Sequence, residues 1–179
     1  MDDAFIPKVA DFGLAKLMGH DFSRVLTTIR GTVGYLAPEW IAGTAVTTKA
    51  DVFSYGMMLF ELISGRRNAG QQPDSTLDFF PVTTMSLLFA GDVRSAVDSQ
   101  LGGNTDVAQV EKVCKVACWC IQDDEADRPA MGEVVQILEG VLDRGMPPLP
   151  RLLETLLGRP HSSTQQMTTV SNTSATFRY

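Results

Sequence analysis

The sequence has no long uninterrupted apolar run. A membrane-spanning helix needs about 18 or more consecutive apolar residues, and the longest candidate, residues 52–63, is interrupted by Glu61. The N-terminus carries Asp2 and Asp3 where a signal peptide has basic residues. These 179 residues therefore predict neither a membrane span nor a secretory leader.

An excess of positive charge and a set of paired cysteines are also missing. The formal net charge is −6, which argues against a nucleic-acid or anionic-membrane surface. The three cysteines, Cys114, Cys118 and Cys120, are an odd number without a histidine close in sequence. This pattern is not typical of a disulfide framework or a zinc site. We expect buried thiols in a protein from a reducing compartment.

The most informative stretch runs from Lys8 to Trp40. Asp11-Phe12-Gly13 follows a short apolar segment, and Ala37-Pro38-Glu39 begins 24 residues after Gly13. A carboxylate beside a flexible glycine suits Mg²⁺, which takes one or two carboxylates together with phosphate oxygens. The loop between the two triplets carries four hydroxyl residues: Ser23, Thr27, Thr28 and Thr32.

The two triplets, with Gly31-Thr32-Val33-Gly34-Tyr35 between them, resemble the activation segment of protein kinases. Residues 27–40 are similar to plant receptor-like serine/threonine kinases, with the G-type lectin S-receptor-like branch as a candidate, and the resemblance covers about residues 2–143. It implies that Asp11 binds metal and that residues 11–39 form the activation segment. It also implies substrate docking by Gly31, Thr32 and Tyr35. The phosphorylation candidates are Ser23, Thr27 and Thr28, of which Thr28 is preferred.

The family's Gly-rich loop, its strand lysine and its His-Arg-Asp catalytic loop all precede the Asp-Phe-Gly triplet, and only ten residues precede Asp11. The resemblance implies ATP and Mg²⁺ for the whole kinase, but we expect no catalytic residue and no tight cofactor binding in these residues. Three interpretations stay open. The chain is an inactive part of a serine/threonine kinase, a docking module or decoy for a protein substrate or homologous kinase, or a truncated product without a role of its own.

The expected fold is mainly α: an incomplete kinase-like C-terminal lobe with an activation segment and four to five helices. Residues 52–63 are apolar nearly all round and predict a buried helix. Thr48 and Asp51 resemble a capping box at its start, and Gly65 is suited to end it. Further helices are expected over 81–90, after Asn104 or Thr105 as the cap, and after residues 127–129, where Ala130 lacks a capping side chain.

The resemblance also assigns structural roles to three residues. Arg128 is expected to pair with Glu39, 89 positions away, and Asp51 to accept hydrogen bonds from the catalytic-loop backbone. The alternatives are a solvated helix start for Arg128 and, for Asp51, a first-turn acid favoured by the helix dipole.

The expected domain division is a partial kinase domain over 1–145 and a Pro-containing spacer with a disordered Ser/Thr-rich tail over 146–179. The resemblance implies a parent receptor in the plasma membrane with its kinase on the cytoplasmic side, and we expect this segment to be soluble.

Overall fold

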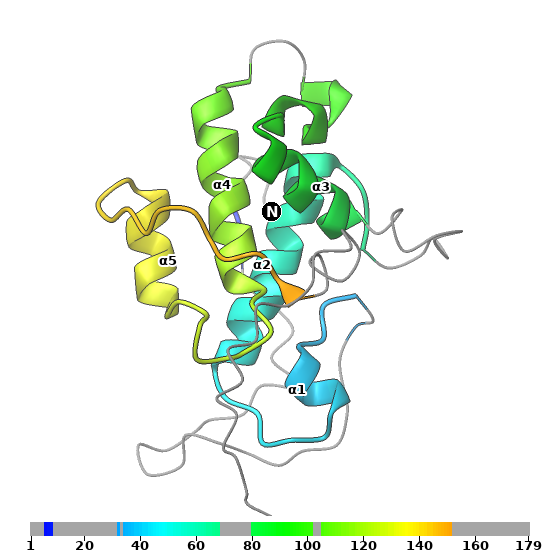
Figure 1. Ribbon diagram of the computed structural model, residues 1–179, viewed down its shortest axis with the longest axis vertical. Helices are drawn as coiled ribbons and strands as arrows, with labels where there is room; N and C mark the ends of the chain where they lie inside the picture. Colours follow the sequence, from blue (N-terminus) through cyan, green and yellow to red (C-terminus); the bar gives the residue numbers. More distant parts are fainter. Residues whose placement is uncertain (1–5, 9–31, 33, 69–79, 102–104, 152–179) are drawn as a thin grey trace, which may run out of the picture.

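The computed structural model describes residues 6–8, 32, 34–68, 80–101 and 105–151, and its elements within these ranges are helical (Figure 1). The elements are α1 (Pro38–Ile41), α2 (Lys49–Ser64), α3 (Phe80–Ala90), the 3-10 helices η3 (Val93–Ala96) and η4 (Ser99–Leu101), α4 (Val107–Cys120) and α5 (Met131–Leu138). The expected mainly helical fold is confirmed. The tail expected to be disordered lies almost wholly outside the described residues. None of the helices in the ranges above is long and apolar enough to cross a bilayer.

The core lies where α2 packs against α4, the most extensive contact between described helices. α3 and α5 flank α4 on opposite sides in Figure 1. The two central helices approach closely at Gly56, because a Cβ there would lie 2.6 Å from the Cβ of Cys120. The three cysteines are free and buried, as expected from the sequence. Both helices bury side chains in this core, among them Val52, Leu59, Phe60 and Val116, and Ile121 joins them directly after α4.

The prediction that residues 52–63 form a helix buried all round is wrong for one face. Leu59 and Phe60 are 5% and 0% exposed, whereas Met58 and Leu62 are 39% and 58% exposed. Met58 and Leu62 are one turn apart and so lie on the same side of α2. These two side chains form an apolar stripe that is open to solvent, so no helix in the described part of the chain covers it.

The start of α2 differs from the expected capping box. Thr48 has a helical backbone (φ −61°, ψ −13°) and makes no side-chain cap, whereas an N-cap needs extended geometry to reach the first N–H groups. The hydroxyl of Thr47 instead accepts a hydrogen bond from the Lys49 N–H at 3.1 Å. The end of α2 is as predicted, since Gly65 adopts the left-handed conformation (φ 68°).

The cap of α4 differs from the prediction, whereas the start of α5 agrees with it. Asp106, rather than Asn104 or Thr105, caps α4, and its carboxylate accepts from the N–H groups of Ala108 (3.0 Å) and Gln109 (3.4 Å). Ala130 provides no capping side chain to α5, as expected. Glu133 compensates in part, since its carboxylate accepts from the Ala130 N–H at 2.8 Å.

The chain turns back after α5. In Figure 1 its orange segment crosses α4, and the indole N–H of Trp119 donates to the Gly145 carbonyl at 3.3 Å. Leu149 packs against the hydrophobic core, and Pro147 and Pro150 are buried. The expected domain division at residue 145 stays a prediction. Residues 146–151, the described start of the expected spacer, lie against the helical core.

Candidate functional site

The site begins with a tight turn that leads into α1. The Tyr35 N–H donates to the Thr32 carbonyl at 3.2 Å, and Gly34 between them has a positive φ of 98°. Pro38 occupies the start of α1, where its missing N–H costs nothing. Glu39 follows in the first turn, and its carbonyl accepts from the Thr44 N–H at 3.1 Å. The turn therefore presents the Glu39 carboxylate at a fixed place beside α2.

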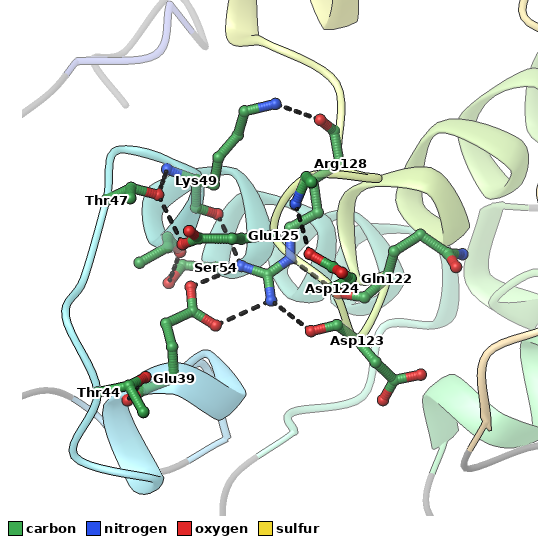
Figure 2. Close-up of polar contacts among 12 residues, drawn as sticks. Glu39, Thr44, Thr47, Lys49, Ser54, Gln122, Asp123, Asp124, Glu125 and Arg128 are labelled. Carbon is green, nitrogen blue, oxygen red and sulfur yellow. Dashed lines mark hydrogen bonds and ion pairs between the residues drawn. The ribbon is translucent and has the colours of Figure 1, made fainter. Parts of the chain in front are cut away.

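The Glu39 carboxylate meets the guanidinium of Arg128, which lies just before α5 (Figure 2). The contact is bidentate: Nη1 donates to Oε1 at 2.7 Å and Nη2 to Oε2 at 2.9 Å. The side chains are 0% exposed for Arg128 and 10% for Glu39. Planar, charge-assisted pairs of this kind are among the strongest hydrogen bonds in proteins. The structure thus brings together the two residues that the sequence resemblance pairs.

Backbone carbonyls take the remaining donors of Arg128. Nε donates to the Gln122 carbonyl at 2.8 Å, Nη1 to the Lys49 carbonyl at 3.1 Å and Nη2 to the Asp123 carbonyl at 3.3 Å. The guanidinium also lies 5.0 Å from the centroid of the Phe53 ring, a cation–π contact. All five N–H groups of the buried guanidinium are therefore satisfied. These hydrogen bonds offset the free-energy cost of removing the charged guanidinium from water.

A second set of contacts links the start of α2 to the loop before α5 (Figure 2). The Thr47 hydroxyl donates to the Glu125 carboxylate at 2.9 Å, and the Lys49 ammonium donates to the Arg128 carbonyl. Of the residues in these contacts, only Arg128 was predicted from the sequence. Thr47 and Glu125 are 78 positions apart, and a lone threonine and glutamate in polar segments give no signal of pairing.

Tyr35 is held to α2 at both ends. Its hydroxyl donates to the Glu61 carboxylate at 2.5 Å, and its carbonyl accepts from the Ser54 hydroxyl at 2.8 Å. The hydrogen bond to Glu61 raises the pKa of Tyr35, and burial adds to the effect. A signal for Glu61 was available, because an acid within an otherwise apolar helix needs a partner when it is not fully exposed.

The structure leaves the other predicted site residues untested. Asp11, Phe12, Gly13, Ser23, Thr27, Thr28 and Gly31 lie outside the described residues. Ala37 is fully buried, and Asp51 is exposed in the first turn of α2, where the helix dipole favours a carboxylate. Within the described ranges no cluster of His, Cys, Asp or Glu could hold a metal ion. The metal assignment therefore rests on Asp11 and stays a prediction.

The turn that carries Glu39 and the helices behind it lie in a region that matches a known protein family. The family model of the protein kinase domain matches residues 1–138. The chain belongs to the protein kinase family. The part of that domain seen here contains Ala37-Pro38-Glu39 and the partner arginine of its glutamate.

The chain is also similar to plant receptor-like kinases. A G-type lectin S-receptor-like serine/threonine-protein kinase of Arabidopsis thaliana is 62% identical over 159 residues, which cover 88% of this chain and 19% of that protein. The related SD2-2 kinase of Arabidopsis thaliana is 50% identical over 165 residues, covering 88% of this chain and 21% of its own length. The resemblance drawn from the sequence is confirmed. The chain spans about a fifth of the length of these curated relatives.

Proposed function

We propose that these residues form the substrate-docking part of a receptor-like serine/threonine kinase, which transfers the γ-phosphoryl group of ATP to a protein hydroxyl. The observation that carries this proposal is the bidentate pair between Arg128 and Glu39, since it fixes the turn after residue 32 to the helical core. Thr32, Gly31 and Tyr35 are the proposed docking residues. Tyr35 supports this role because α2 holds it at both its hydroxyl and its carbonyl.

Phosphoryl transfer by kinases depends on positioning and electrostatic stabilisation more than on covalent chemistry of the protein. The residues described here contribute positioning. The turn at 34–39 is held at two points, by the contacts of Tyr35 with α2 and by the pair of Glu39 with Arg128. A substrate segment bound along it would therefore be held in one orientation. Asp11 is proposed as the Mg²⁺ ligand from its sequence context alone; Mg²⁺ would neutralise charge on the transferred phosphate. The proposed phosphorylation sites, Ser23, Thr27 and Thr28, rest on the same context.

We further propose that the 179-residue polypeptide does not transfer phosphate by itself. The sequence contains no counterpart of the strand lysine or of the His-Arg-Asp base. Purified chain incubated with labelled ATP, Mg²⁺ and a generic protein substrate should incorporate no label above a heat-treated control. Turnover by the purified chain would contradict this proposal.

A docking module or decoy is the second candidate function, because the anchored turn is complete without an ATP site. The partner would be a protein substrate or a homologous kinase domain on the cytoplasmic side of the plasma membrane, where the parent receptor would act. An immobilised homologous kinase domain should retain the chain, and Tyr35→Ala should weaken retention while Thr83→Ala, on α3, leaves it unchanged. Retention no greater than that of a scrambled-sequence control would dismiss the decoy.

A further inference from the structure

The segment from Asp143 to Arg151 forms a strap across the helical core. We call these residues the C-terminal strap. Trp119 contacts it twice: the indole N–H donates to the Gly145 carbonyl, and the guanidinium of Arg144 lies 4.2 Å from the ring centroid. Arg144 also donates from Nη2 to the Asp127 carbonyl at 3.2 Å. The first half of the strap is thus attached both to α4 and to the residue before Arg128.

The second half of the strap is held by Gln122 and Asp123. The buried amide of Gln122 donates to the Cys118 carbonyl at 2.8 Å and to the Pro148 carbonyl at 3.2 Å. The Asp123 carboxylate accepts from the Arg151 N–H at 2.9 Å. These bonds fix the loop between α4 and α5 from its C-terminal side.

The same two loop residues hold Arg128 through their backbone. The Gln122 carbonyl accepts from Nε and the Asp123 carbonyl from Nη2. A chain of hydrogen bonds therefore runs from the strap through the loop to Arg128, and from Arg128 to the Glu39 carboxylate. We call residues 34–44, which carry the Glu39 carboxylate, the docking turn. The strap and the docking turn lie at opposite ends of this series of hydrogen bonds.

We propose that the C-terminal strap positions Arg128 and thereby holds the Glu39 turn in place. Without the strap, Gln122 and Asp123 lose their outer partners, and the carbonyls that orient the guanidinium become free to move. The strap is a positioning element, since it reaches the docking turn only through Arg128. Its buried prolines support this role, because a stiff Pro-rich segment needs little ordering on docking.

Amide hydrogen exchange on two shortened chains tests the proposal. One chain ends after Arg151 and keeps the strap, and the other ends after Gly145 and loses most of it. The readout is four amides that are hydrogen-bonded around Glu39 in the docking turn, those of Trp40, Ala42, Gly43 and Thr44. The reference is the Asp98 amide, which donates at 2.8 Å to the carbonyl of Ile63 in the last turn of α2.

Loss of the strap should speed exchange of the turn amides at least about tenfold relative to the Asp98 amide. The chain that ends after Arg151 should behave like the full chain. Unchanged exchange in the turn would overturn the proposal. Equal acceleration at the turn and at Asp98 would also overturn it, because that result means general destabilisation without positioning.

A point variant covers the case in which the shorter chain does not fold. Asp123→Ala removes the carboxylate that holds Arg151 and keeps the carbonyl that holds Arg128. It should speed exchange in the turn by about threefold or more, and Asp123→Asn should restore most of the protection. Asp92→Ala is the matched control, because Asp92 is an exposed acid before η3 whose carboxylate accepts from the Ser95 hydroxyl. Equal effects of Asp123→Ala and Asp92→Ala would refute the proposal. None of these measurements requires phosphoryl transfer, so they can fail while the proposed function stands.

Discussion

Arg128 carries the highest concentration of polar contacts in the described residues, although its side chain is fully buried. A buried guanidinium is costly unless each donor has an acceptor. Here one carboxylate and three carbonyls accept from it, and they come from three separate segments of the chain. The residue is therefore a junction between α1, the start of α2 and the loop before α5.

Breaking this junction should be expensive. Glu39→Ala leaves a buried charge without its counterion and should lower the free energy of unfolding by about 3–5 kcal/mol. Urea denaturation measures the loss. Glu139→Ala, an exposed glutamate after α5, should change stability by less than about 0.5 kcal/mol.

The double variant Glu39→Ala/Arg128→Met tests whether the two residues act as a pair. Its loss should be smaller than the sum of the single losses by up to about 3 kcal/mol. Additive losses would show that Arg128 acts through its carbonyl contacts and not through Glu39.

The buried thiols of α4 make a pH-dependent prediction. Burial raises the pKa of Cys114 and of Cys120 to about 12, and it also raises the pKa of Cys118 well above its ordinary value. Free thiols ionise near pH 8.5, so the unfolded chain loses protons that the folded chain keeps. Stability should therefore be fully present below about pH 8.5 and fall as pH rises from there towards 12, by up to about 1.4 kcal/mol per pH unit and thiol.

Urea midpoints measured at rising pH check this slope, and a thiol reagent provides an independent readout. At about pH 8 the folded chain should react slowly, and unfolding in urea should make all three cysteines reactive. Fast reaction of the folded chain would show that α4 does not bury these thiols.

Among the described elements, α2 and α4 make the most extensive contact, and they approach closely at Gly56. A Cβ on Gly56 would lie 2.6 Å from Cys120 Cβ, 2.8 Å from Ile121 Cγ2 and 3.0 Å from the Ala117 carbonyl. Because part of this wall is backbone, the helices must separate to admit a methyl group. Gly56→Ala should cost about 1–3 kcal/mol net, although alanine is the better helix former.

Gly132 is the matched control for this prediction, since it lies in α5 and a Cβ there would have no atom within 4 Å. Gly132→Ala should leave stability unchanged or raise it by up to about 1 kcal/mol. Thermal or urea unfolding of the two variants gives the comparison. Similar effects at the two positions would remove the case for a close crossing at Gly56.

The helix boundaries show how far sequence patterns reach. A continuous apolar run and a glycine stop located α2, because an apolar run and a left-handed cap are local properties. Local chemistry was not enough to choose Asp106 over Asn104 or Thr105 for α4, since all three side chains can cap a helix. The predicted capping box at Thr48 was wrong for a related reason. Whether the backbone of a residue is extended depends on the conformation of the loop before it, which the local sequence does not determine.

For the whole molecule, the sequence predicted the family from its motifs, and it predicted the pair of Glu39 and Arg128 from the resemblance to that family. It did not predict the contacts of Thr47 with Glu125 or of Gln122 with the strap. Those contacts join segments that carry no motif, so only the packed fold brings them together. Composition also suggested that α2 was buried all round, because an apolar sequence does not show which face lacks a neighbour.

The exposed stripe of α2 leads to a prediction for the molecule as a whole. Met58 and Leu62 leave apolar surface open to water, so the folded chain should bind the dye ANS. Leu62→Gln should reduce dye binding and shift the free energy of unfolding by less than about 0.5 kcal/mol. Leu59→Gln, at a side chain of α2 that is only 5% exposed, should cost about 3 kcal/mol or more. Equal destabilisation by both changes would mean that Leu62 is covered in solution, and the stripe would then belong to the core.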